Sequence, residues 1–198
     1  HREQLQRHRA ENEAYIAEIT QSFEELVFLR NMAGYLELTD LSHDPWKLAE
    51  TVLPVLCSSI KAESLILVPT REDGKSCDAA NAEVGEPTLW VGSQATKGKT
   101  CRRLVERYMH EAAEQPVVRN AFHEAPEGAR FPGVREFLLV PLSAAGRVAG
   151  WLLAINRVAG RGFMPRNDQC PLSHMEFGTV EAGLVTSAAS ILAVHARN

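Results

Sequence analysis

Apolar residues recur in heptads along the first 38 positions of the chain, which contain no proline. Two seams, three residues apart, hold this pattern: Leu5, Asn12, Ile19, Leu26 and Ala33, and His8, Tyr15, Ser22, Leu29 and Leu36. Heptads over this length predict a helix that pairs with another helix, and Asn12 fits the register-setting polar position of a two-stranded parallel coil. A single amphipathic helix lying on its own domain explains residues 15–38 equally well. We assign residues 1–40 to a coiled-coil helix that forms a homodimer.

A second domain is expected over residues 41–198. Asp44 and Pro45 are typical of a helix start, because aspartate caps the first turn and proline fits the first helical position. This helix extends to Ile60, and Pro54 is expected to kink or split it. The next elements are a strand at residues 64–69, a loop at 70–87, a strand at 88–91, a helix at 100–114 and an irregular segment at 115–133.

The clearest local pattern is a long hairpin. Its arms, Glu136–Leu142 and Val148–Ile155, are apolar on both faces, so the sheet must be covered on both sides. A last helix is expected over residues 172–198, with one stripe of large and one of small apolar residues, which indicates two packing partners. The predicted fold class is α+β: a five- to six-stranded antiparallel sheet with helices on both faces and a long N-terminal helix.

Composition narrows the function classes. Hydrophobic residues make up 45% and charged residues 23%, which is the balance of a globular protein rather than a disordered one. A net charge of −4 argues against a nucleic-acid partner. The longest uncharged stretch, Gly183–Ala196, is too short to span a bilayer, so no membrane contact is expected. The four cysteines form no CxxC pair, which favours ordinary thiols, a cytoplasmic location and no metal site.

The hairpin and its surroundings resemble the GAF domain family. The similar segments are Phe137–Leu142, which ends in Val-Pro-Leu, Gly146–Gly150, and Leu152–Asn156, which ends on asparagine. The last helix, with Phe177 before an alanine-rich stretch, is similar too. The resemblance covers residues 41–198, and residues 1–40 are similar to the signalling helix that often precedes such domains. It implies a GAF/PAS-like sheet.

One motif of the cyclic-nucleotide-binding members has a counterpart in this chain. Those members carry Asn-Lys, a spacer, Phe, three residues and Asp-Glu; this chain has Asn156-Arg157, Phe177 and Glu181 at the matching offsets. Lysine is replaced by arginine, aspartate by glutamate, and the closing glutamate is lost. We interpret Asn156, Arg157, Phe177 and Glu181 as a structural latch in which Glu181 ties the last helix to the hairpin. A cyclic nucleotide remains an open alternative.

Enzyme chemistry has one weak candidate. Some members of the family reduce free methionine sulfoxide with clustered cysteines, and Cys101 begins a helix beside Arg102 and Arg103, a placement expected to lower its pKa. The cysteine spacing does not match that subfamily, and none of the four cysteines precedes a histidine as in bilin-binding relatives. We therefore expect no catalytic residue, and the cofactor stays unassigned.

The resulting expectation is a small-molecule-sensing regulatory domain of a larger bacterial-type signal-transduction protein, such as a sensor kinase or a cyclic-dinucleotide enzyme. Its ligand signal would pass through the terminal helices. The resemblance places the pocket between the sheet and the 100–114 helix, with residues 115–133 as lid. The candidate lining residues combine stacking surface and hydrogen-bonding groups: Trp90, Phe122, His123 and Glu136. Two alternatives remain, a dimerisation scaffold without a ligand and a reductase-like enzyme.

Overall fold

The computed structural model describes residues 45–71, 77–78, 82–158 and 176–196, together with isolated positions between His8 and Arg30. The chain divides into two compact units, residues 1–40 and residues 41–198. The described positions of the first unit are helical, and the large apolar side chains among them are exposed: Tyr15, Ile16, Ile19, Leu26 and Val27. The continuous helix over residues 1–40 lies mostly outside the described residues and stays a prediction.

The second unit is built on a six-stranded sheet in the order β3-β1-β6-β5-β4, with β2 paired to β6. Every strand pairing is antiparallel. The strands are β1 (Ala62–Pro69), β2 (Cys77–Asp78), β3 (Leu89–Gly92), β4 (Val117–Arg119), β5 (Phe137–Ala144) and β6 (Arg147–Arg157). This arrangement confirms the predicted antiparallel sheet of five to six strands.

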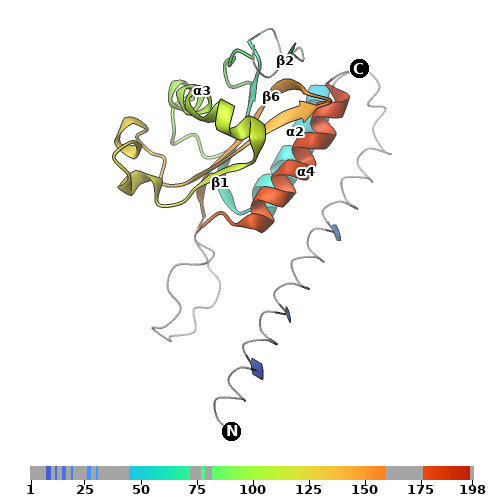
Figure 1. Cartoon of the computed structure of the whole chain (residues 1–198), viewed down its shortest axis with the longest axis vertical. Helices are drawn as coiled ribbons and strands as arrows, with labels where there is room; N and C mark the ends of the chain where they lie inside the picture. Colours follow the sequence, from blue (N-terminus) through green and yellow to red (C-terminus); the bar gives the residue numbers. More distant parts are fainter. Residues whose placement is uncertain are drawn as a thin grey trace. The chain divides into compact units, whose positions relative to one another are not determined.

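Helices cover both faces of the sheet, as Figure 1 shows. α2 (Pro45–Ser59) and α4 (Thr179–His195) lie side by side on one face, while α3 (Gly98–Glu114) lies on the other. Two short 3-10 helices, Phe122–Glu124 and Gly128–Arg130, follow β4. Among the described residues, no helix is both long and apolar enough to cross a membrane.

The β5–β6 hairpin forms the centre of the sheet, as its two-sided apolar pattern predicts. A two-residue turn joins the strands, and both turn residues, Ala145 and Gly146, have positive φ values of 51° and 75°. Such a turn matches the right-handed twist of the flanking strands. Side chains alternate between the two covers: Leu139 and Leu153 face α3, whereas Leu138 and Ala154 belong to the opposite face.

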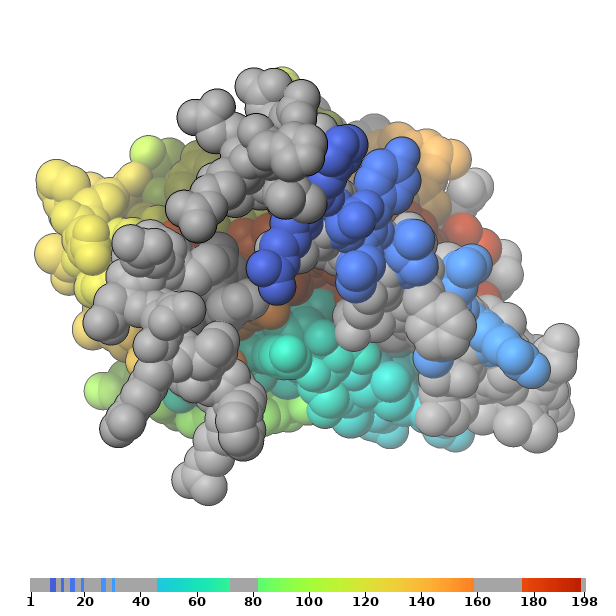
Figure 2. Space-filling model, turned by 90° about the horizontal axis from the view of Figure 1, so that it is seen from below, coloured from blue at the N-terminus to red at the C-terminus, as the bar shows by residue number. Residues whose placement is uncertain are grey.

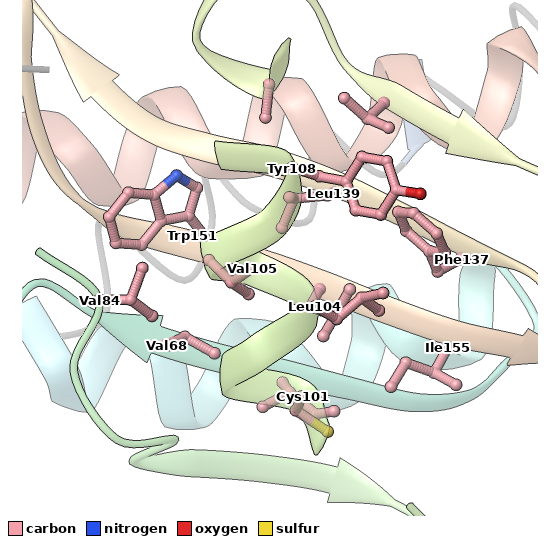
Figure 3. Packing of buried hydrophobic residues seen from close by; sticks show 14 of the residues in the cluster. Val68, Val84, Cys101, Leu104, Val105, Tyr108, Phe137, Leu139, Trp151 and Ile155 are labelled. Atoms are coloured by element: carbon pink, nitrogen blue, oxygen red, sulfur yellow. The ribbon is translucent and has the colours of Figure 1, made fainter. Parts of the chain in front are cut away.

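The core on the α3 side is continuous from helix to sheet. Figure 3 shows its principal members: Cys101, Leu104, Val105 and Tyr108 from α3, Phe137 and Leu139 from β5, Trp151 and Ile155 from β6, Val68 from β1 and Val84. All of these side chains are at most 5% exposed. Burial of this apolar surface is the main stabilising contribution to the domain.

Four details differ from the sequence prediction. β2 and β4 fall in segments expected to be irregular, because strands of two and three residues are too short to show a period. α2 continues through Pro54 as one helix instead of splitting. α4 begins at Thr179 rather than at residue 172, since Phe177 and Gly178 are non-helical and Glu181 accepts a hydrogen bond from the Gly178 N–H.

Candidate functional site

Aromatic rings occupy the space between α3 and the sheet where the sequence predicts a ligand pocket. Phe122, one of the predicted lining residues, is 3% exposed. Its ring centroid lies 5.0 Å from that of Phe137 in an edge-to-face arrangement and 5.7 Å from that of Phe131. Tyr108 completes the group at 5.1 Å from Phe137. Phe122 therefore contributes to the hydrophobic core of the domain.

The other three predicted lining residues lie at separate places. Trp90 is half-buried on the edge strand β3, and its indole N–H donates to the Ser93 carbonyl at 2.8 Å. The His123 side chain is 52% exposed. Glu136 accepts a hydrogen bond from the Arg157 backbone N–H at 2.6 Å. Trp90 lies on β3, and His123 follows β4. These two strands are the opposite edges of the sheet, so the predicted lining residues do not meet at one site.

A polar junction joins the end of β6 to the start of α4. Arg157 Nη2 lies 2.8 Å from Glu181 Oε1, and the two side chains are only 12% and 13% exposed. Glu181 Oε2 accepts a hydrogen bond from the Gly178 N–H at 2.8 Å, which caps the helix at the end where negative charge is favourable. Arg157 also donates from Nη1 to the Glu176 carbonyl. The Arg157 guanidinium thus contacts both the first turn of α4 and the residue three positions before the helix.

Asn156, the residue before Arg157 near the end of β6, supports this junction. Its φ of 52° is left-handed, a conformation that asparagine adopts more easily than most residues. The side-chain oxygen accepts from the Arg135 N–H at 2.8 Å, and the amide nitrogen donates to the Gly133 carbonyl at 2.9 Å and to Glu63 Oε2 at 3.0 Å. The side chain is buried and satisfied, so it fixes the segment before β5 against β1 and β6.

Phe177 is anchored by a residue that the sequence did not single out. Asn120 accepts from the Phe177 N–H at 3.0 Å and donates to the Phe177 carbonyl at 2.9 Å, while the phenyl ring is 2% exposed. Glu63 is a second contributor of this kind, through its bond to Asn156. The partners lie 57 and 93 positions apart in the sequence, so no local spacing signals either contact.

A pocket of about 580 Å³ lies at the edge of the sheet, beside the first turns of α2 and the segment before β3. It is lined by apolar and aromatic residues, with hydroxyl and charged groups around them: Trp46, Leu67, Pro69, Val84, Gly85 and Leu89, with Glu50, Thr70, Arg71, Glu86, Thr88 and Arg102. Residues of α2, in cyan, form part of the surface in the view of Figure 2. None of the four predicted lining residues borders this pocket.

Comparison with solved structures identifies the architecture. The free methionine-R-sulfoxide reductase of Neisseria meningitidis matches 90% of this chain and 92% of its own, with 15% identity and a TM-score of 0.54. The GAF domain of an Acinetobacter phosphoenolpyruvate-protein phosphotransferase matches 86% and 91%, with 15% identity and a TM-score of 0.53. The GAF domain of a Pseudomonas syringae sensor histidine kinase matches 92% of both chains, with 18% identity and a TM-score of 0.51.

The chain has the GAF fold. No family model and no curated protein matches the sequence. At 15–18% identity, the likeness to these structures establishes the fold alone.

The environment of Cys101 in this domain corrects the expectation of a lowered pKa. The thiol is fully buried between α3 and the sheet, and burial raises its pKa to about 12, while a backbone hydrogen bond lowers it by less. Desolvation of the thiolate outweighs the helix terminus and the neighbouring arginines, whose side chains are half-buried or exposed. Cys101 is therefore a neutral thiol at physiological pH and a small apolar group of the core.

The Tyr108 hydroxyl and the Glu127 carboxylate form a hydrogen-bonded pair in which both pKa values are shifted. The Tyr108 hydroxyl donates to Glu127 Oε2 at 2.8 Å, and Arg107 Nε donates to Glu127 Oε1 at 2.6 Å. Burial, followed by this hydrogen bond, raises the pKa of Tyr108 to about 12. The same bonds, first from Tyr108 and then from Arg107, lower the pKa of Glu127. The pair ties α3 to the segment that follows β4.

The buried Cys101 thiol is expected to resist thiol–disulfide exchange. A Cys57→Ala/Cys77→Ser/Cys170→Ser variant leaves Cys101 as the sole thiol of the chain. At pH 8, native protein should react with a disulfide reagent roughly a thousandfold more slowly than a free thiol of ordinary pKa, because so little thiolate is present. The same protein in urea should react rapidly. Fast reaction of the folded variant, with a midpoint below pH 9, would contradict this assignment.

The Arg157–Glu181 pair is expected to contribute more stability than an exposed pair of the same type. Glu181→Gln keeps an acceptor for the Gly178 N–H but leaves the buried guanidinium unpaired, so it should cost about 2–4 kcal/mol in urea denaturation. The control is Glu83→Gln, since the Arg71–Glu83 pair is 70% and 67% exposed. This control should change stability by less than about 0.5 kcal/mol. Equal effects of the two variants would show that the junction adds nothing special.

Proposed function

We propose that this GAF domain is a small-molecule-sensing regulatory domain of a larger bacterial-type signal-transduction protein, such as a sensor kinase or a cyclic-dinucleotide enzyme. The ligand signal passes through the terminal helices. The likeness to the GAF domain of a sensor histidine kinase supports this class of function. The observation that carries the proposal is the junction at which Arg157 and Glu181 join the central strand to α4.

The junction supports transmission of a ligand signal because a few short, nearly buried bonds couple the sheet, at the end of β6, to the helix α4. Arg157 is the last residue of β6, and Glu181 lies in the first turn of α4. Asn156 links the same point to β1 and to the segment before β5. A ligand that displaces these elements therefore changes the position of α4. Two discrete arrangements of such a contact would serve as a switch.

A dimerisation scaffold without a ligand is the second candidate. It is favoured by the packing between α3 and the sheet, where Tyr108, Phe122, Phe131 and Phe137 fill the interior. The reductase-like alternative requires an accessible thiolate, and the burial and raised pKa of Cys101 argue against that residue in the role. We therefore propose that the domain is not an enzyme.

Ligand-dependent melting separates the sensor from the scaffold. The screen contains cyclic AMP, cyclic GMP, haem and a panel of small metabolites. A ligand at 100 times its dissociation constant should stabilise the domain by about 2.7 kcal/mol. Hydrogen exchange at the start of α4 should change when that ligand binds. Absence of stabilisation by every compound at millimolar concentration would favour the scaffold.

We further propose a parallel homodimer through residues 5–36. The heptad seam and the exposure of Ile19 and Leu26, both 65% exposed, support it. Leu26→Glu combined with Leu29→Glu should give monomers in light scattering, because charges in the seam are costly to desolvate. Asn31→Glu is the control, since position 31 lies on the outer face of the same heptad. A wild-type chain that is monomeric at tens of micromolar would contradict the dimer.

A further inference from the structure

The pocket beside α2 presents an apolar surface, an aromatic ring and a carboxylate to the same space. Leu67 of β1 and Leu89 of β3 are paired across the edge of the sheet, and both line the pocket. Trp46 and Glu50 line it from α2. Because these two residues are four positions apart in a helix, they lie on the same face, one turn from each other.

The other charged groups that line the pocket all take part in ion pairs. Arg102 lies 2.6 Å from Glu86 and 2.9 Å from Glu106. Arg71 is paired with Glu83 at 3.0 Å. Glu50, by contrast, has neither an ion pair nor a hydrogen bond among the residues that the structure describes. Among the described charged residues that line the pocket, Glu50 is therefore the one without an ion-pair partner, and its charge is negative.

We propose that this pocket binds an organic monocation, a protonated amine or a quaternary ammonium group attached to an apolar body. The apolar body contacts Leu67, Pro69 and Leu89, while the ammonium group faces the Glu50 carboxylate. The indole of Trp46 adds a cation–π surface at the same end of the pocket. Apolar walls with a few polar groups that fix orientation are the usual form of a small-molecule site. This inference deepens the proposed sensory function and rests on it.

Charge complementarity disfavours the other small-molecule classes. An anion would face Glu50 and find both arginines of the pocket already paired with glutamates. A neutral ligand would gain the apolar contacts but leave Glu50 without a partner. A cation gains both the apolar contacts and the attraction to the Glu50 carboxylate. A protonated amine also donates a charge-assisted hydrogen bond, which is about twice as strong as a neutral one.

A charge series on one apolar body tests the proposal. The probes are 4-phenylbutylamine, 4-phenyl-1-butanol and 4-phenylbutanoate, which are a cation, a neutral molecule and an anion at pH 7. Isothermal titration calorimetry on the full chain measures the affinity of each. We expect the amine to bind, the alcohol to bind about tenfold more weakly, and the anion to bind more weakly still.

Two variants and one control assign the effect to named residues. Glu50→Gln removes the charge and keeps the shape, so it should weaken the amine about tenfold and leave the alcohol unchanged. Trp46→Leu should weaken the amine about threefold. Glu114→Gln, at the exposed end of α3 and outside the pocket, should leave all three affinities as in the wild type.

The outcomes separate this inference from the proposed function. No binding of the amine, equal binding of the three probes, or an amine affinity unaffected by Glu50→Gln would each overturn the site. A compound from the melting screen that binds Glu50→Gln as tightly as the wild type would support the sensor and count against this pocket. Amine binding that depends on Glu50, with no change in hydrogen exchange of α4, would support the site and contradict the signalling role.

Discussion

Strand β6 is the element on which the rest of the domain depends. It pairs with β1, β2 and β5, and nine of its eleven residues are buried. A strand buried on both faces needs a cover on each side. α3 supplies one cover, and α2 with α4 supplies the other. The positions of all three helices therefore follow from the requirement that one central strand be kept from water.

The residues of β6 are buried from Val148 to Asn156, and the strand approaches the surface at Arg157. The polar junction lies at this boundary. Asn156 turns the backbone through a left-handed conformation while its side chain bonds to three groups, two in the segment before β5 and one in β1. Arg157 then meets Glu181 in a nearly buried pair. Removing two charges from water is costly. The cost is offset by the Coulomb attraction, by the bond of the guanidinium to the Glu176 carbonyl and by the bond that Glu181 accepts from the Gly178 N–H. Arg157 Nε has no hydrogen-bond partner among the described residues, so this compensation is incomplete.

The sequence predicted the elements that have a period and missed the contacts that have none. The hairpin and its place in the sheet followed from the apolar runs of β5 and β6. The sequence resemblance to the GAF family in this hairpin agreed with that prediction. β2 and β4 were missed because they are too short to show alternation. The lowered pKa expected for Cys101 was wrong, since sequence neighbours show nearby cations but not the depth at which a side chain is buried. Asn120 and Glu63 act across 57 and 93 residues, so only the folded chain brings them to the junction.

The arrangement of α2 explains how the proposed site could act on α4 without passing through the interior. The rings of Tyr108, Phe122 and Phe137 leave the α3 side closely packed, and such a core resists small displacements. α2 lines the edge pocket with Trp46 and Glu50 and packs directly against α4 on the opposite face of the sheet. Under the proposed function, a ligand that draws in the first turns of α2 shifts its contact with α4. Because the Arg157–Glu181 pair holds the start of α4, such a shift would act mainly on the part of the helix beyond that pair.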